Sequence, residues 1–431
     1  MKVLIVNTSE DTGGAAVAMG RLAEALSDCG VEATMLVRDR AKGQRGPIPV
    51  RCLKWKWLQR WRFFVERLYI FIVQGFSRRN LFKIDPACTG ADITTLTVFK
   101  EADIIHLHWI NQGFLALRSL RHIMESGKPV VWTMHDMWEC TSLCHHAHNC
   151  HRYEVECCEC PLLAHPAPHD LAHKVFRRKQ KIYARAKRLH LVAVSQWLAE
   201  KTQRSALSRH LPVSVIPNTI SLSGFKPMSR EATRKALGIS EPYVIALGAA
   251  RIDDPIKGFA YLCEALHILK NRGTFPSDSV RLLLFGEVRD QSLLQQIPIP
   301  YTHLGYISGT ERLSLIYSAS NATVSSSLYE TFGQTLIEAM ACGSLPVSFD
   351  GSGQTDIITH LKTGYLARRL SAESLADGIT WALKSDIPAA VLRDEVTARY
   401  SGSVVAKRYV SLYNHLLQNE AETDVSALPT K

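Results

Sequence analysis

The order of apolar and polar positions along the chain predicts an α/β domain in its first half. Short apolar runs occur at residues 3–6, 31–37, 104–108, 130–134 and 191–194. Between these runs, apolar residues recur at helical spacing, as at residues 115–125. Buried strands that alternate with helices in this way form a parallel sheet covered on both faces.

The same pattern starts again after residue 218 and predicts a second α/β domain. Strands are expected at residues 243–247, 281–285, 322–324 and 345–348, and helices at residues 259–269, 311–319 and 332–341. We therefore expect two Rossmann-like domains that face each other across a cleft, where open α/β sheets bind ligands. The expected domains are residues 1–215 and 216–402, followed at 403–431 by a helix that packs back on the first domain and by a frayed tail.

Composition narrows the class of protein. The hydrophobic share of 46% and the charged share of 21% are values of a globular chain rather than a disordered one. The net charge of +11 points to phosphate or anionic lipid among its ligands. The apolar run at residues 3–6 is shorter than the roughly 7 to 15 residues of a signal peptide, so we expect a cytoplasmic protein.

Two glutamates eight positions apart form the most specific candidate site. Glu330 precedes an expected helix, and Glu338 lies about two turns along it. The turn amides of Thr331, Phe332 and Gly333 can then face a phosphate, while both carboxylates accept hydrogen bonds from sugar hydroxyls. The alternatives are that Glu330 only caps the helix and that Glu338 is solvated. The apolar neighbours of Glu338 favour a defined partner for its carboxylate.

Two cations flank a loop that follows another expected strand. Arg251 and Lys257 come after residues 243–247 and lead into a helix. Cations at the carboxyl end of a strand suit a diphosphate. The alternative is ordinary ion pairing with Asp253 and Asp254.

Together these stretches resemble the retaining family 4 glycosyltransferases, which use sugar nucleotides and have two Rossmann-like domains, the GT-B architecture. The resemblance includes Gly13 and Gly14 after the first strand, and His135 with Asp136 after residues 130–134. It extends to glycosyltransferases of bacterial capsular or exopolysaccharide synthesis.

The resemblance implies a role for most of these residues. By this resemblance, Glu330 would bind hydroxyls of the donor sugar and Glu338 the ribose of the nucleotide. Arg251 and Lys257 would bind the diphosphate, and Gly13 and Gly14 would let the backbone approach the donor closely. His135 would contact the transferring sugar. A donor phosphate oxygen would take the acceptor proton on the same face of the sugar, so catalysis would need neither a protein nucleophile nor a metal or other cofactor.

The expected function is that of a hexosyltransferase-like enzyme. It would move a sugar from a nucleoside-diphosphate sugar to a glycan or lipid-linked glycan in bacterial surface polysaccharide synthesis. The alternative is a non-catalytic, zinc-containing protein that binds nucleic acid. Glu330 and Glu338 disfavour nucleic acid, because carboxylates repel a polyanion. The sugar, the base, the acceptor and the oligomeric state stay open.

Six of the eleven cysteines lie between residues 140 and 160. The spacing of Cys144, Cys150, Cys157 and Cys160 predicts a structural tetrahedral Zn²⁺ site in preference to free thiols. Alternative ligands nearby are Cys140, Cys158, His145, His146, His148 and His151. A closed site with four cysteines has no open position for a substrate, so the metal would brace a loop.

Two segments concentrate the positive charge. Residues 51–83 hold nine Lys or Arg against Glu66 alone, interleaved with aromatic residues that include Trp55, Trp57 and Trp61. This pattern predicts an interfacial helix on an anionic membrane, on the inner face of the cell membrane; the alternative is a domain helix with buried rings and a basic outer face. Residues 174–190 add eight basic residues and no acid, which predicts a second phosphate-facing surface.

Overall fold

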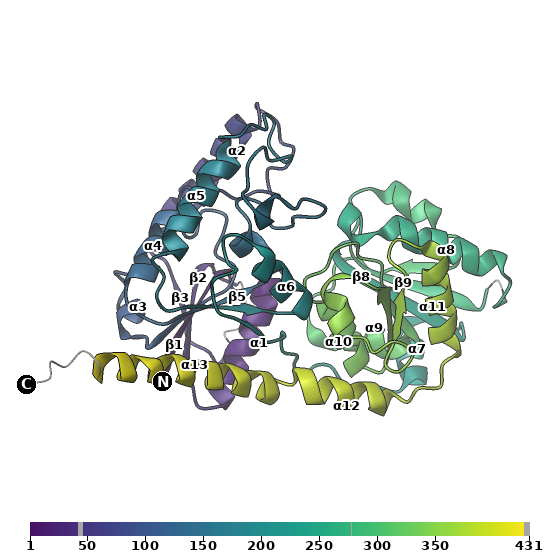
Figure 1. The fold of residues 1–431 in the computed structure, drawn as a ribbon. Coiled ribbons are helices and arrows are strands. Elements are labelled where there is room, and N and C mark those ends of the chain that lie inside the picture. The colour runs from purple at the N-terminus through teal and green to yellow at the C-terminus, as the bar shows by residue number, and fades with distance from the viewer. Residues whose placement is uncertain (42–45, 277, 426–431) are drawn as a thin grey trace, which may run out of the picture. The chain divides into compact units, whose positions relative to one another are not determined.

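The computed structural model describes residues 1–41, 46–276 and 278–425 of the chain. The chain forms two compact units (Figure 1). Unit 1 consists of Met1–Pro217 together with Gly402–Lys431, and unit 2 consists of Asn218–Ser401. Each unit is a parallel-sheet α/β fold of the Rossmann type, so the fold class predicted from the sequence is confirmed.

In the described part of unit 1, seven parallel strands form one sheet in the order β3-β2-β1-β4-β5-β6-β7. The strands are β1 (Lys2–Ser9), β2 (Glu32–Asp39), β3 (Val50–Cys52), β4 (Ile104–Leu107), β5 (Val130–Met134), β6 (Leu189–Ala193) and β7 (Val213–Val215). Every residue of β4 and β5 is buried. The strand order reverses between β1 and β4, and the carboxyl ends of strands at such a switch point are where open α/β sheets bind ligands.

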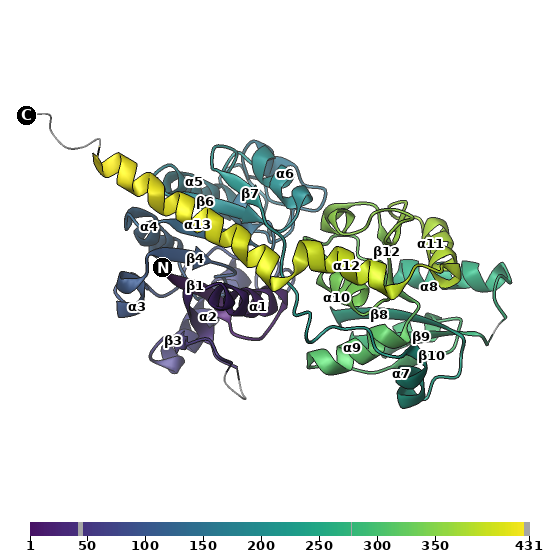
Figure 2. The same ribbon diagram turned by 90° about the horizontal axis from the view of Figure 1, so that it is seen from below.

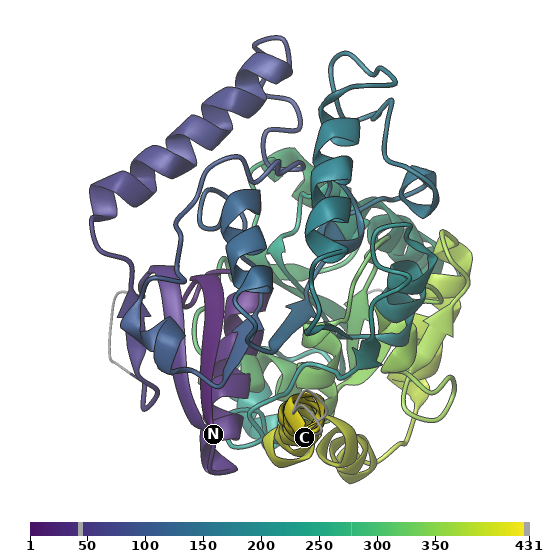
Figure 3. The ribbon, with the colours of Figure 1, turned by 60° about the vertical axis from the view of Figure 1, so that its left-hand side comes forward.

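Helices from both ends of the chain cover this sheet. They are α1 (Gly14–Asp28), α2 (Lys56–Val73), α3 (Thr97–Glu101), α4 (Leu117–Glu125), α5 (Leu171–Tyr183), α6 (Gln196–Arg204) and α13 (Gly402–Val425). Although α13 is the last of the described helices, it packs on α1 (Figure 2). Its residues Val405, Tyr409 and Tyr413 join the core of unit 1. These three residues are spaced by four and therefore share one helix face. Figures 1 and 3 show α2 and α5 at the same end of the unit.

The described residues of unit 2 form a six-stranded parallel sheet in the order β10-β9-β8-β11-β12-β13. Its strands are β8 (Tyr243–Arg251), β9 (Val280–Glu287), β10 (Tyr301–His303), β11 (Ala322–Ser325), β12 (Leu345–Phe349) and β13 (Tyr365–Ala367). Its α-helices are α7 (Arg230–Leu237), α8 (Phe259–Asn271), α9 (Thr310–Ala319), α10 (Gln334–Ala341), α11 (Ala372–Lys384) and α12 (Ala389–Tyr400). The switch point of this sheet lies between β8 and β11.

Candidate functional site

At the switch point of unit 2, the loop after β8 is locked against the segment after β11. The backbone amide of Leu328 donates to the carbonyl of Ile256 at 2.8 Å, and the hydroxyl of Ser326 donates to the carbonyl of Lys257 at 2.8 Å. Gly258 has φ +61°, and a Cβ atom there would lie 2.1 Å from the carbonyl oxygen of Ser326. Glycine therefore permits the close contact that brings the two loops together.

This contact places Lys257 beside Glu330. The Lys257 ammonium lies 2.9 Å from a carboxylate oxygen of Glu330, and both side chains are about three-quarters buried. The charge of Glu330 raises the pKa of Lys257 above its ordinary value, against the opposing effect of burial. Arg251 instead pairs with Asp253, with 3.3 Å between its Nε and a carboxylate oxygen. The ion pairing considered for Arg251 is thus present, while Lys257 reaches a carboxylate of the candidate site.

The turn before α10 does not use Glu330 as a helix cap. In the described structure Gly333, with φ 113°, precedes the first helical residue, Gln334, and no side chain caps this end. The helix begins two residues later than expected, so the amides of Thr331 and Phe332 belong to the turn. The idea that Glu330 only caps the helix is therefore wrong.

Glu338 is buried within α10. Its side chain belongs to a residue that is 5% exposed, and the hydroxyl of Tyr317 donates to Glu338 Oε2 at 3.4 Å. The alternative of a solvated Glu338 is therefore wrong. Tyr317 on α9 is a partner that sequence spacing did not reveal, because the two helices are brought together only by the fold.

A third loop, after β12, holds the backbone of Glu330. The amide of Glu330 donates to the hydroxyl of Ser352 at 3.1 Å, and the amide of Gly353 donates to the carbonyl of Glu330 at 2.8 Å. A Cβ at Gly353 would lie 2.1 Å from the carbonyl oxygen of Thr331. Neither Ser352 nor Gly353 was expected from the sequence, although a Gly-Ser-Gly run one residue after a buried strand was an available signal of a loop.

In unit 1, the two predicted glycines follow β1. Gly13 has φ +90°, a conformation that favours glycine, and Gly14 begins α1. A Cβ added at either position meets no atom of the described residues within 4 Å. Steric crowding by the described residues therefore does not explain why both positions are glycine.

His135 directly follows β5 and is half-buried. Its Nε2 lies 2.8 Å from Nδ1 of His108, which follows β4. Burial lowers the pKa of His135 to about 4, although the charge of Asp136 acts in the opposite direction. The ring is therefore neutral near pH 7 and interacts through hydrogen bonds rather than as a cation.

Asp136 anchors the segment that follows. Its carboxylate accepts hydrogen bonds from Trp109 Nε1 at 2.9 Å, from the Trp138 amide at 2.7 Å and from His145 Nδ1 at 2.8 Å. Burial acts to raise the pKa of Asp136, but His145, the charge of His146 and the Trp138 amide outweigh it and lower the pKa to about 2. Asp136 is thus an ionised structural group at the start of the cysteine-rich segment.

The predicted zinc site finds no support. Cys144, Cys150, Cys157 and Cys160 line one small cavity together with Cys158, and every cysteine of the chain is free. Across residues 1–41, 46–276 and 278–425, however, no three His, Cys, Asp or Glu side chains come together as a metal-binding group. Among the alternative ligands, His145 is paired with Asp136, His151 lies 3.0 Å from Glu154, and the thiol of Cys140 donates to the carbonyl of Met137.

The second basic segment is not wholly a surface. Lys179 of α5 is 1% exposed, and its ammonium donates to the carbonyls of Trp138 and Thr141 at 2.6 and 3.1 Å. Burial lowers the pKa of Lys179 to about 7. Lys179 therefore stabilises the backbone at the start of the cysteine-rich segment and is not part of a phosphate-facing surface.

Helix α2 exposes one apolar face. Five large apolar residues on one face are between 41% and 64% exposed: Trp57 (64%), Trp61 (57%), Phe64 (52%), Leu68 (41%) and Ile72 (50%). The opposite face buries three polar residues, Gln59, Glu66 and Arg67, together with Ile70. The alternative that the tryptophans are buried is therefore wrong. None of the described helices is long and apolar enough to cross a membrane.

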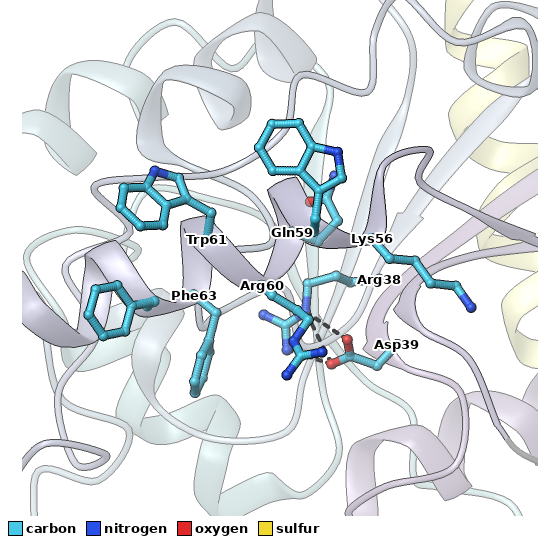
Figure 4. A pocket seen from close by; sticks show the side chains of 9 residues that line it. Arg38, Asp39, Lys56, Gln59, Arg60, Trp61 and Phe63 are labelled. Carbon is cyan, nitrogen blue, oxygen red and sulfur yellow. Dashed lines mark hydrogen bonds and ion pairs between the residues drawn. The ribbon is translucent and has the colours of Figure 1, made fainter.

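The first turns of α2 line a hollow of about 940 Å³ with the end of β2 (Figure 4). Lys56 and Arg60 are exposed cations on its wall, beside the rings of Trp57 and Trp61. Arg38 is held by Asp39, with 3.1 Å between its Nε and a carboxylate oxygen, as Figure 4 shows. The hollow thus combines exposed cationic side chains with aromatic rings.

Comparison with known proteins identifies both units. The sequence model "Glycosyltransferase Family 4" matches residues 12–223, and "Glycosyl transferases group 1" matches residues 229–399. Together they take in most of the chain.

Individual relatives and structures agree with these matches. The phosphatidyl-myo-inositol mannosyltransferase of Mycobacterium tuberculosis is 30% identical over 55% of this chain, and the match spans 62% of that relative's length. The putative colanic acid biosynthesis glycosyl transferase WcaC of Escherichia coli is 22% identical over 75% of this chain and 78% of WcaC. Anabaena HepE, solved with UDP and glucose, has the same fold, with a TM-score of 0.62 and 17% identity over 96% of this chain and 100% of HepE. The first half of the chain therefore belongs to glycosyltransferase family 4 and the second half to the group 1 glycosyl transferases, and the chain has the GT-B type of fold.

Proposed function

We propose that this glycosyltransferase moves a sugar, with retention of configuration, from a nucleoside-diphosphate sugar to a glycan or lipid-linked glycan during bacterial surface polysaccharide synthesis. The observation that carries this proposal is the Lys257–Glu330 pair at the switch point of unit 2, beside the turn of α10 and the buried Glu338. The solved complex of HepE with UDP and glucose and the name of WcaC support the donor class and the polysaccharide setting.

In this proposal unit 2 holds the donor. Glu330 uses one of the three N–H donors of the Lys257 ammonium, so the others can bind diphosphate oxygens together with Arg251. The amides of Thr331, Phe332 and Gly333 add partial positive charge at the start of α10. Glu330 and Glu338 accept hydrogen bonds from the donor's sugar and ribose hydroxyls.

Cations and amides of this kind stabilise the leaving group. The bond between the anomeric carbon and the diphosphate oxygen breaks while a bond from the acceptor oxygen forms on the same face. The acceptor proton passes to a phosphate oxygen of the departing diphosphate. Because negative charge grows on that diphosphate, Lys257 and Arg251 lower the barrier electrostatically. His135, being neutral, contacts a hydroxyl of the transferring sugar, and Gly13 and Gly14 leave room for the donor.

The exposed face of α2 is the proposed membrane surface. Exposed aromatic rings settle at the headgroup level of a bilayer, and Lys56 and Arg60 attract anionic lipid. The buried polar face fixes the helix to unit 1, so the apolar face is presented as a rigid element. This arrangement suits a cytoplasmic, peripheral enzyme whose acceptor is held by lipid.

The nucleic-acid alternative has no support. No metal-binding group is present in the described part of the chain, and both sequence families are families of glycosyltransferases. The carboxylates of Glu330 and Glu338 would also repel a polyanion.

A donor screen tests the proposed function. Purified protein is incubated with a panel of UDP-, GDP- and ADP-sugars, and the released nucleoside diphosphate is measured. We expect turnover of one donor class, its loss in Glu338→Gln, and wild-type turnover in Glu373→Gln, which changes an exposed carboxylate on α11. The anomeric configuration of the transferred sugar, read by NMR, must match that of the donor. Turnover of no sugar nucleotide, or inversion, would overturn the proposal.

A further inference from the structure

A buried chain of polar side chains joins His135 to helix α13. Tyr413 OH lies 2.7 Å from His106 Nδ1, and His106 Nε2 lies 2.8 Å from Thr133 Oγ1. Thr133 Oγ1 in turn lies 2.8 Å from Tyr409 OH. The two tyrosines thus bond, from α13, to side chains of β4 and β5.

His106 and His108 lie side by side because alternate residues of an extended strand share a face. Their ring centroids are 4.4 Å apart, and the rings of His108 and His135 are stacked with centroids 5.1 Å apart. The indole of Trp132 also donates to the carbonyl of His108 at 3.0 Å. The hydrogen bond fixes the backbone of His108, and packing against the rings of His106 and His135 restricts rotation of its side chain.

Burial determines the protonation of these rings. His106 and His108 are at most 1% exposed, and burial lowers the pKa of each, that of His106 to about 3. Both rings are neutral near pH 7, so each carries one N–H group. In the 2.8 Å contact between His108 Nδ1 and His135 Nε2, one nitrogen must donate and the other must accept.

The other ring nitrogen of His108 decides the direction of this hydrogen bond. His108 Nε2 is buried and has no hydrogen-bond partner among the described residues. A buried N–H group without an acceptor is rarer in proteins than an acceptor with an unused lone pair. The proton of His108 therefore lies on Nδ1 and is donated to His135 Nε2. His135 then carries its own proton on Nδ1.

We propose that His108 is a positioning residue that fixes the tautomer and the ring orientation of His135, and that α13 holds His108 in place through Tyr413 and His106. This inference rests on the proposed role of His135 at the transferring sugar. In this arrangement the Nδ1–H group of His135 is the hydrogen-bond donor of its ring. Helix α13 then contributes to the orientation of His135.

Two substitutions of similar size test the direction of the bond. The amide of Asn reaches the position of the histidine Nδ1, whereas the amide of Gln reaches that of Nε2. We expect His108→Asn to keep a donor for His135 and His108→Gln to lose it. The matched control is His190→Asn, because His190 lies in the same sheet but bonds to Ser214 at 2.9 Å.

The first readout is the histidine tautomer, measured by long-range ¹H–¹⁵N NMR on the full chain. We expect His135 to be protonated on Nδ1 in the wild type, His108→Asn and His190→Asn, and to become a mixture of tautomers in His108→Gln. Tyr413→Phe, which removes one hydroxyl from the far end, should shift the same signal less. An Nε2-protonated His135 in the wild type, or equal spectra for His108→Asn and His108→Gln, would overturn the proposal.

The second readout is transfer kinetics. Because a small misplacement of a reacting group can cost up to about a hundredfold in rate, we expect His108→Gln to lower kcat roughly tenfold or more while KM for the donor changes less. His108→Asn should recover most of this loss. If His135→Ala keeps the wild-type kcat, the role of His135 in the proposed function fails, but the tautomer measurement still decides whether His108 orients it.

Discussion

Arg67 lies 3.1 Å from Asp85, with both side chains buried between α2 and the body of unit 1. Asp85 also accepts hydrogen bonds from the amides of Gln112 and Ala87, and Glu66 accepts one from the amide of Cys88. Buried charge on the inward face of a helix is costly unless it is paired, and here Arg67 is paired with Asp85. This ion pair attaches α2 firmly while leaving the apolar face exposed.

The first prediction concerns that exposed face. Replacement of Trp55, Trp57 and Trp61 by serine should weaken binding to anionic vesicles by at least about tenfold, because the three rings together lose interfacial contacts worth at least about 1.4 kcal/mol. The three tryptophans are 57–66% exposed, so the free energy of unfolding should change little. Vesicle flotation at low and high salt, with urea unfolding in parallel, measures both effects.

Two controls accompany this experiment. Neutral vesicles should bind the wild type weakly, and salt should weaken the anionic binding because Lys56 and Arg60 contribute charge attraction. Unchanged flotation of the triple variant would exclude α2 as the membrane surface, and unfolding of that variant would mean that the rings support the core.

The second prediction concerns Glu66. Burial, followed by the charge of Asp85, raises the pKa of Glu66 from its ordinary 4.5 to about 8. The folded state thus holds a proton that the unfolded state releases, so this contribution to stability is complete below about pH 4.5 and is lost as the pH rises through about 8. We expect the free energy of unfolding to fall between pH 5 and 8 and Glu66→Gln to flatten that slope. Glu101→Gln, at an exposed position on α3, should leave it unchanged.

Continuous apolar strands and amphipathic helices could be located from the sequence alone. β4, β5, β8 and α10 stand near the expected positions because runs of apolar residues leave few other ways to bury them. The edge strands β3, β7, β10 and β13 have three residues each and were missed, since a pattern of that length carries no period.

Contacts between distant segments could not be predicted. Aromatic residues interleaved with basic ones indicated an interfacial helix, but which face of it turns inward is set by contacts such as the Arg67–Asp85 ion pair. The cysteine spacing fitted a zinc site, and the loop does bring four of these cysteines to one small cavity, but they form no metal-binding group in the described chain. His108 meets His135 only because β4 and β5 pair.

The third prediction concerns the ion pair of unit 2. Lys257→Ala should raise the activation free energy by about 2 to 4 kcal/mol, which lowers kcat/KM for the donor roughly 30- to 1,000-fold, because it removes a cation from the leaving diphosphate. Glu330→Gln should also reduce it. Since the two groups touch, the double variant should lose less than the sum of the single losses. Lys270→Ala, an exposed lysine on α8, is the control, and strict additivity would contradict a shared site.

The fourth prediction isolates the contact that builds the donor site. Gly258 and Gly273 have nearly the same left-handed φ, +61° and +60°. A Cβ at Gly258 would lie 2.1 Å from the Ser326 carbonyl oxygen, while a Cβ at Gly273 meets none of the described atoms within 4 Å. Both alanine variants share the backbone cost of about 1 to 2 kcal/mol, so any difference between them reports the steric contact.

Gly258→Ala should therefore push the loop that carries Lys257 away from the segment that leads to Glu330. We expect it to weaken donor binding, measured by calorimetry, at least about tenfold more than Gly273→Ala does, because Lys257 and Glu330 are no longer held in position to bind the same donor molecule. Gly273→Ala should lose stability in urea but bind the donor as the wild type does. Equal donor affinities in the two variants would mean that the close packing of Gly258 on Ser326 serves stability alone, and that Lys257 does not depend on it for its position.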